Sequence, residues 1–380
     1  MPLTRPAFDN TELEAVQACL ASGWVTQGPY VSRFETLIAQ QQRVKHALAV
    51  TSCTAALHVA AEALQLGPGD EVVVPAFTWI TSAHSAEYVG AKAVFADIDL
   101  STFNLDPAAF EAAITPRTKA VVAVHLFGLA APMAALMATA RKYGIHVIED
   151  GACAIGTTWN GIPVGGIGDV GCFSFHPRKA ITTGEGGAIT TNDEDIARRV
   201  KILRNHGATG NPQSDPDAKN AWTMAEFGAR GYNLRLSDIQ AAVGVAQFAK
   251  LEALLDERRM RADRYHALLA DIPDVIRPAQ TMEKRAHTYQ SFVIMIRDGG
   301  RERRNAVMTL LSENYIQSRP GTHAVPRLSY YSDKYKLDAR QFPNAVVAED
   351  TSITLPIFPG MTDHDQDRVV DVLRTALARF

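Results

Sequence analysis

The chain has 380 residues, of which 47% are hydrophobic, and its formal net charge is −3 with acidic and basic residues interspersed. This length is enough for a large core and for about two domains. The charge pattern excludes a basic footprint for nucleic acid and a polybasic patch for membranes.

The cysteine pattern and the first residues narrow the class of protein further. The four cysteines form no CxxC pair and have no zinc-type spacing, which argues against a metal site or a disulfide framework. The first residues lack the pattern of a signal peptide, and no apolar run approaches the roughly 18 residues that a membrane helix needs. We therefore expect a soluble cytoplasmic protein without a metal.

The N-terminal part of the chain predicts two helices followed by an alternation of strands and helices. The first helix is expected at 9–23, and a turn followed by the second helix at 26–42. Strands are expected at 46–52, 70–76, 92–99, 119–127 and 145–150, and helices between them at 54–64, 79–90, 106–114 and 132–144. Nearly continuous apolar strands alternating with helices are typical of a mostly parallel sheet covered on both faces.

The pattern changes beyond residue 170. Residues 171–193 predict a strand, a turn and a second strand. Residues 208–220 are rich in turn formers, so we expect a mobile loop there. Ser237 and Gln240 form a capping box that predicts one long helix over 238–269. That helix leads into a smaller C-terminal domain, and the expected domains are 1–250 and 251–380.

One short motif, "GIGDVG" at 166–171, matches the GxGxxG pattern of dinucleotide-binding proteins. In those proteins the motif follows a strand and opens a helix, because the phosphates bind at the helix N-terminus. Here a predicted strand, "CFSFH", follows the motif instead. We therefore do not predict a dinucleotide site.

Four other features could carry chemistry, although each has a structural explanation as well. Asp150 closes a predicted buried strand, where α/β sheets bind ligands, but a buried arginine could equally be its partner. Thr54 begins a helix that could bind an anion, although capping alone would explain it. Trp79 follows a strand end and could be a stacking surface or part of the core. Lys179 follows Pro177 in a turn between strands, where most lysines would simply be solvated.

Together these residues supply an amine, an acid, an aromatic ring and an anion site. A pyridoxal 5′-phosphate (PLP) site needs this set, with a Schiff-base lysine and an acid beside the pyridinium nitrogen. A turn that starts at Pro177 and ends in "GEGG" would hold Lys179 in place. Accurate placement matters, because a shift of about 1 Å can cost on the order of 10²-fold in rate. Glu185 in that turn is expected to be structural.

The chain resembles a known family, the DegT/DnrJ-type PLP-dependent sugar aminotransferases. The resemblance covers nearly the whole chain, and the segment around Lys179 is its most specific part. The motifs that carry it are "SGWVTQGP", "TSCTAALH", "VPAFTW", "VHLFG", "IEDGACAIG", "CFSFHPRKAITTGEGGAITTND", "LRNHG", "GYNLRLSDIQAAVG" and "LPIFPGMT". It implies fold type I: a mostly parallel seven-stranded sheet flanked by helices, plus a smaller α+β C-terminal domain.

The resemblance also implies roles for individual residues. Lys179 would form the Schiff base with PLP, Asp150 would hold the pyridinium nitrogen, and Trp79 would stack on the ring. The residues implied at the cofactor phosphate are Thr54, Ala55, Ser174 and, from the other subunit of a homodimer, Asn233. Cys153 stands where a Gln or His often lies beside the cofactor. The residues implied in substrate binding are Gly23, Trp24, Arg319 and His323.

The expected reaction is transfer of an amino group, from glutamate, to a keto carbon of a nucleotide-linked deoxysugar. One alternative is amination of a non-sugar ketone such as a cyclitol, or a related aromatising activity. A second is a PLP-dependent sugar dehydratase, although relatives of that kind carry histidine in place of Lys179. A transcriptional regulator is a further class, and the lack of a basic patch or a helix-turn-helix segment argues against it.

Overall fold

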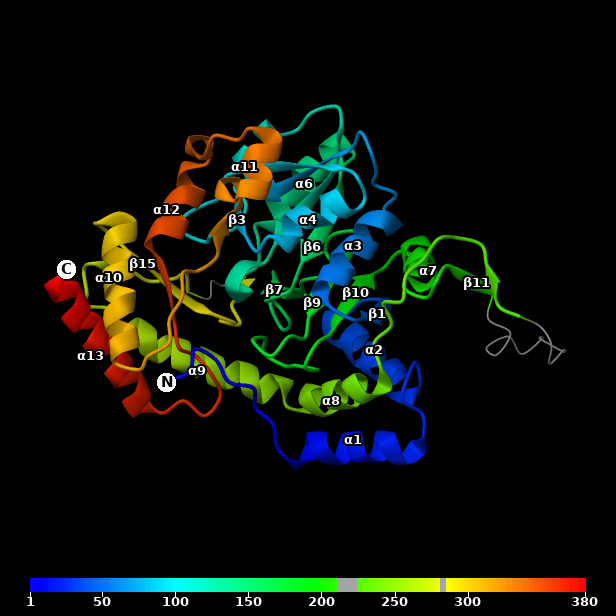
Figure 1. The fold of residues 1–380 in the computed structure, drawn as a ribbon, viewed down its shortest axis with the longest axis horizontal. Helices are drawn as coiled ribbons and strands as arrows, with labels where there is room; N and C mark the ends of the chain where they lie inside the picture. The colour runs from blue at the N-terminus through cyan, green and yellow to red at the C-terminus, as the bar shows by residue number, and fades with distance from the viewer. Residues whose placement is uncertain (211–223, 281–284) are drawn as a thin grey trace.

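The computed structural model describes residues 1–210, 224–280 and 285–380, with a seven-stranded sheet at its centre (Figure 1). The strands lie in the order β1 (His46–Val50), β10 (Gly187–Thr191), β9 (Val170–Ser174), β6 (His146–Asp150), β5 (Thr118–Val124), β2 (Glu71–Pro75) and β4 (Lys92–Ala96). β10 is antiparallel to both of its neighbours, and the other neighbouring pairs are parallel. The predicted mostly parallel seven-stranded sheet is therefore confirmed.

Helices cover both faces of the sheet, which explains why its strands are almost entirely apolar. One face packs against α3 (Cys53–Ala63), α4 (Thr81–Tyr88) and α7 (Glu194–Leu203). The other face packs against α2 (Pro29–Gln42), α5 (Pro107–Ala112), α6 (Met133–Tyr143) and α8 (Asp238–Ala249). Side chains alternate between the faces: Leu48 contacts the first set and Ala47 the second.

The predicted long helix over 238–269 is wrong, because it is two helices. α8 ends before Lys250, and α9 (Leu251–Leu268) begins after it. Lys250 Nζ lies 3.1 Å from Asp9 Oδ2 and also pairs with Glu12, so it ties the junction to the start of α1 (Asn10–Ser22). α1 runs alongside α8 at the edge of the molecule (Figure 1).

The C-terminal part has its own core, as an α+β arrangement requires. Three antiparallel strands, β13 (Val275–Ile276), β15 (Phe292–Ile296) and β17 (Ser352–Leu355), pack with α9, α10 (Gly300–Glu313) and α13 (Asp363–Arg379). The chain's first residues join this core, since Leu3 O accepts a hydrogen bond from Ile357 N at 3.2 Å. We propose the boundary between domains at residues 250 and 251, where α9 begins.

The remaining elements are short. They are β3 (Phe77–Thr78), β7 (Thr158–Trp159), β8 (Ile162–Pro163), β11 (Ala208–Gly210), β12 (Glu226–Phe227), β14 (Arg285–Ala286), β16 (His323–Ala324), α11 (Ser329–Tyr335), α12 (Pro343–Thr351) and three 3₁₀ turns (Leu126–Gly128, Val325–Arg327, Ala339–Gln341). Of the loop predicted over 208–220, residues 208–210 form β11 and the rest lies outside the described residues.

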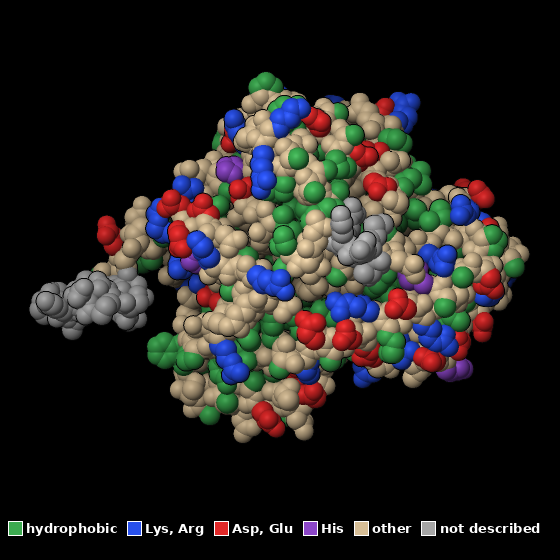
Figure 2. All heavy atoms as spheres, turned by 180° about the vertical axis from the view of Figure 1, so that it is seen from behind, with side chains coloured by type: hydrophobic (Ala, Val, Ile, Leu, Met, Phe, Trp, Pro, Cys, Tyr) green, Lys and Arg blue, Asp and Glu red, His purple; other side chains and the backbone are tan. Residues whose placement is uncertain are grey.

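The surface agrees with the charge pattern of the sequence. On the face shown in Figure 2, basic and acidic side chains lie interspersed. Among the described residues, no helix is both long enough and apolar enough to cross a membrane. The cytoplasmic location stays a prediction.

Candidate active site

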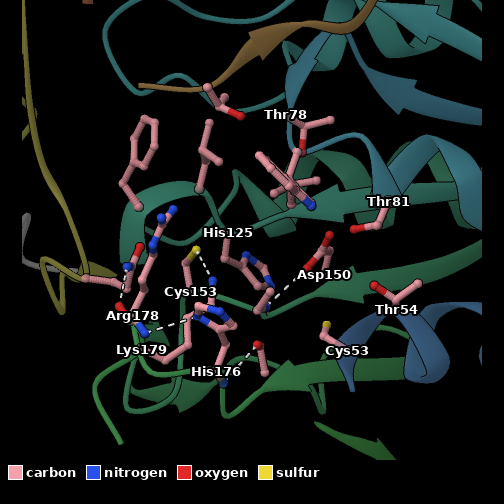
Figure 3. A pocket seen from close by; sticks show the side chains of 18 of the residues that line it. Cys53, Thr54, Thr78, Thr81, His125, Asp150, Cys153, His176, Arg178 and Lys179 are labelled. Carbon is pink, nitrogen blue, oxygen red and sulfur yellow. Dashed lines mark hydrogen bonds between the residues drawn. The ribbon is translucent and has the colours of Figure 1, made fainter. Parts of the chain in front are cut away.

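A cavity of about 430 Å³ lies at the carboxyl ends of β5, β6 and β9, next to the start of α3. Ligands of open α/β sheets bind at this edge. Seven of the predicted site residues line it: Thr54, Trp79, Asp150, Cys153, Ser174, Lys179 and Arg319. Segments that are far apart in the sequence thus converge on one hollow (Figure 3).

Lys179 is held in a tight turn just beyond β9. Its backbone N–H donates to His176 O at 2.9 Å, and the N–H of Arg178 donates to His176 Nδ1 at 3.2 Å. Burial lowers the pKa of His176, although the nearby Glu185 carboxylate opposes this shift. The lowered pKa favours the neutral ring, whose nitrogen accepts this hydrogen bond. The amine of Lys179 points into the cavity and donates to Cys153 Sγ at 3.2 Å (Figure 3).

Hydrogen bonds to the backbone of Glu185 hold the end of the turn that follows Lys179. Glu185 O accepts hydrogen bonds from Thr183 Oγ1 and Gln240 Nε2, both at 2.7 Å. Its exposed carboxylate lies 4.0 Å from His176 Nε2. Gly187 follows, and a Cβ there would lie 2.4 Å from the carbonyl carbon of Ser52. The glycine therefore lets β10 approach the start of α3, next to the cavity.

Asp150 lies on the cavity floor and is 5% exposed. Its Oδ2 accepts from Ser82 Oγ at 2.7 Å, and its Oδ1 accepts from Ala152 N at 3.1 Å. Among the described residues, no cationic side chain lies within 4.0 Å of its carboxylate. A carboxylate has about four lone-pair sites, so Asp150 retains acceptors for a cationic group bound in the cavity. Burial, followed by the negative charge of Asp150, raises the pKa of the neighbouring thiols of Cys53 and Cys172.

The start of α3 forms the other end of the cavity. Ser52 is the N-cap, and its Oγ accepts from Ala55 N at 3.1 Å. The hydroxyls of Thr54 and Ser174 line the cavity close to this helix end. The N-terminus of a helix favours a phosphate, because its free N–H groups and its dipole both attract anions.

Trp79 lies at the cavity mouth and is 54% exposed. Its ring centroid is 5.8 Å from that of His323, with the two planes inclined by 45°. An exposed indole at this position offers a flat face to a bound ring.

Within the described part of the chain, the other predicted site residues do not line the cavity. They are Gly23, Trp24, Ala55, Asn233 and His323. Asn233 is exposed and forms an isolated bridge with Asn205. Their functional roles stay predictions.

Several residues at or beside the cavity were not predicted from the sequence, among them Arg178. Ser82 bonds Asp150 and also lies 3.0 Å from Thr78 Oγ1. His125 and Gln290 line the cavity, and Gln290 comes from the C-terminal part of the chain. His125 lies in the quoted motif "VHLFG", which could have drawn attention to it. Nothing in the sequence places Ser82 next to Asp150, or Gln290 next to the turn that holds Lys179.

His125 and the GxGxxG-like segment belong to one buried network. Nδ1 of His125 accepts from Ala131 N at 3.1 Å, so Nε2 carries the proton that it shares with Glu149 Oε2 at 3.0 Å. The Glu149 carboxylate also accepts from the N–H groups of Gly165, Ile167 and Gly168, at 2.8, 2.8 and 2.6 Å. The glycine-rich segment thus binds a carboxylate of this chain. It leads into the strand β9, as the sequence predicted, and not into a helix.

Comparisons with known proteins agree with this geometry. Residues 6–374 match the model of the DegT/DnrJ/EryC1/StrS aminotransferase family. The chain is 36% identical over 376 residues to the spore coat polysaccharide biosynthesis protein SpsC of Bacillus subtilis, covering 98% of this chain and 96% of that protein.

Solved structures show the same fold over the whole chain. Spr1654 of Streptococcus pneumoniae, named as a sugar aminotransferase, is similar with a TM-score of 0.94 and 27% identity, covering 100% of this chain and 99% of that one. Its structures include a PLP form and a PMP form. 3-Amino-5-hydroxybenzoic acid synthase is similar with a TM-score of 0.90 and 30% identity, covering 99% and 98%.

Fold and site define a PLP-dependent transferase of fold type I. More narrowly, the chain belongs to the DegT/DnrJ/EryC1/StrS aminotransferase family. It is an aminotransferase, and PLP is its cofactor. The site fits the group, because Asp150 is a buried carboxylate without a cationic partner among the described residues and Lys179 offers its amine in the same cavity.

Proposed function

We propose that this aminotransferase moves an amino group from glutamate to a keto carbon of a nucleotide-linked deoxysugar. The observation that carries the proposal is the cavity lined by both the Lys179 amine and the buried Asp150 carboxylate. The sugar is supported by the names of two similar proteins, one for polysaccharide biosynthesis and one for sugar aminotransfer.

The residues have distinct tasks in this proposal. When bound, PLP supplies a ring that withdraws electrons from the reacting carbon. Asp150 holds a proton at the ring nitrogen, and Ser82 orients its carboxylate. Lys179 would hold the cofactor through its amine. Once the amine of the donor has taken its place, the freed Lys179 amine would move a proton to and from the substrate carbon.

The remaining predicted residues hold the cofactor in place. The helix start at Ala55, with the hydroxyls of Thr54 and Ser174, binds the phosphate. Trp79 covers one face of the ring. Cys153 lies beside Lys179, and its thiol is a weaker hydrogen-bond partner than an amide or an imidazole.

Other activities stay open as alternatives. Similarity to 3-amino-5-hydroxybenzoic acid synthase favours testing a non-sugar ketone or an aromatising reaction. A sugar dehydratase is disfavoured, because this chain has Lys179 where such relatives carry histidine.

The deciding experiment is a panel of keto-sugar nucleotides and non-sugar ketones, each incubated with enzyme, PLP and glutamate. Mass spectrometry should show replacement of the keto oxygen by NH₂ in one or more sugar nucleotides. Amination of non-sugar ketones alone would replace the proposal with the cyclitol-type alternative, and loss of water without amination would replace it with the dehydratase.

We also propose that the working unit is a two-fold homodimer. Asn233 is exposed and lies outside its own chain's cavity, so a phosphate contact would have to be made to a second copy. Large apolar side chains are exposed on and around α1: Phe8 57%, Leu13 67%, Leu20 55% and Trp24 58%. Burying such side chains favours association. In this dimer Gly23, Trp24 and His323 would contact the substrate.

A further inference from the structure

Arg178 and Arg319 lie at the margin of the cavity without an acidic partner. Arg178 directly precedes Lys179 and is exposed, whereas Arg319 lies before β16 and is half-buried. Both line the cavity, and both also line a second hollow that reaches α10. In the described parts of the chain, no carboxylate lies within 4.0 Å of either guanidinium.

Their surroundings differ from those of other arginines in the same region. Arg327, for example, lies 2.7 Å from Glu349 and 2.6 Å from Asp350. Arg319 instead has a buried Nε without a hydrogen-bond partner. Burial lowers the pKa of its guanidinium, and the positive charge of Arg178 lowers it further. An anion bound between the two would relieve this repulsion and supply the missing acceptor.

Contacts from the C-terminal part fix the backbone of both arginines. Gln290 Nε2 donates to Arg178 O at 2.8 Å, and Thr354 N donates to Arg319 O at 2.7 Å. Both side chains therefore extend from backbone positions that are fixed next to the cavity.

The position of the pair indicates which anion it binds. The cofactor phosphate belongs at the start of α3, and Arg178 lies across the cavity from Thr54 (Figure 3). Arg178 directly precedes Lys179 in the chain and lines the same cavity, so an anion bound here shares the cavity with the carbon that exchanges its amino group. The α-carboxylate of an amino acid is bonded to that carbon, whereas a sugar ring separates a nucleotide's diphosphate from the keto carbon.

We infer that Arg178 and Arg319 bind the α-carboxylate of the amino donor. This inference rests on the proposed use of an amino acid as donor. It does not depend on the identity of the acceptor, because the donor half of the reaction proceeds without it.

The test uses Arg178→Gln and Arg319→Gln in the PLP-loaded enzyme. Glutamate is titrated without acceptor, and the loss of visible absorbance gives its half-saturating concentration. Loss of a charged hydrogen bond should raise that concentration about 10- to 100-fold in each variant. Calorimetry with succinate, which carries carboxylates but no amino group, should show a similar loss of affinity. Benzylamine, a donor without a carboxylate, should react equally with all variants.

Two further variants complete the design. Arg340→Gln is the matched control, since the Arg340 side chain is 90% exposed and, among the described residues, forms an ion pair with Asp338 alone. Arg178→Lys should lie between wild type and Arg178→Gln, because lysine keeps the charge but cannot bind a carboxylate in two places.

An unchanged glutamate constant in Arg178→Gln, whose side chain is exposed, would overturn the inference even if Arg319→Gln failed to fold. A raised KM for the acceptor with an unchanged glutamate constant would also overturn it and assign the pair to a phosphate of the acceptor. Failure of all keto-sugar nucleotides would refute the proposed function alone, because the glutamate titration omits them.

Discussion

The amine of Lys179 donates a hydrogen bond to the thiol of Cys153 across 3.2 Å. Lys179 follows β9, and Cys153 follows β6. The two strands are parallel neighbours, with Asp150 of β6 opposite Cys172 of β9. Both side chains therefore leave the sheet at the same edge, and the sheet topology places them together.

Cys153 should contribute modestly to cofactor binding. A thiol is a weak hydrogen-bond partner, so Cys153→Val should weaken PLP binding by no more than about fivefold. Cys153→Ser should bind like wild type. An absorbance titration of the apoenzyme with PLP measures both constants. A loss above about 100-fold in Cys153→Val would contradict the modest role, because a neutral hydrogen bond contributes less than this.

Lys179→Ala should keep the fold and lose turnover by roughly 10³-fold or more, because it removes both the covalent attachment and the proton carrier. Thermal unfolding should occur at the wild-type temperature. Borohydride should fix PLP to Lys179 in the wild type, as shown by peptide mass, and should fix none in the variant. Lys201→Ala, on the exposed side of α7, is the control. Wild-type turnover in Lys179→Ala would refute the assignment.

Asp150→Asn should still bind PLP but turn over about 10²- to 10⁴-fold more slowly, because an amide does not hold a proton at the ring nitrogen. Ser82→Ala removes only the 2.7 Å hydrogen bond to Asp150 and should cost far less. Single-turnover kinetics with glutamate compare the two variants. Full activity in Asp150→Asn would show that Asp150 is only a structural acid.

The two residues whose substitution is expected to reduce turnover most are also residues that the sequence predicts. Asp150 and Lys179 were predictable, because each closes or follows an apolar run and each belongs to a specific motif. The strands of the large sheet were predictable for the same reason. Their spatial order was known only through the family resemblance, since no local pattern specifies which strands pair.

Contacts between distant segments were not predictable. Ser82 reaches Asp150 from α4, and Gln290 reaches Arg178 from the C-terminal part. The predicted long helix failed at Lys250, whose side chain pairs with acids at the start of α1 that are about 240 residues away in the sequence. All three contacts join segments far apart in the sequence, and local propensity carries no information on them.

His287 should make the protein less stable in acid. It is 2% exposed, and burial, together with the charge of the nearby His266, lowers its pKa to about 3. Below its unfolded pKa of about 6.5, the unfolded chain takes up a proton that the folded chain does not. The free energy of unfolding therefore falls as the pH falls from about 6.5 towards 3, by at most about 1.4 kcal/mol per pH unit.

His287→Gln should remove this dependence. Urea unfolding at pH 7 and pH 5 should show that the wild type loses about 2 kcal/mol more than the variant between these values. The variant should be the less stable protein at pH 7, since it loses the stacking of His287 on Tyr289 at 3.8 Å. Equal losses in both proteins would show that His287 is not responsible.

Mixed dimers should reveal whether Asn233 acts across a subunit interface. Lys179→Ala and Asn233→Asp should each be nearly inactive, the second because a carboxylate would repel the cofactor phosphate. In a heterodimer, one site carries both changes and the other carries neither. An equal mixture that exchanges subunits should recover roughly a quarter of wild-type activity, since half of the dimers are mixed and each has one intact site. Subunit exchange is checked with a mass-tagged chain. No recovery in an exchanging sample would place Asn233 in its own subunit's site or outside the site altogether.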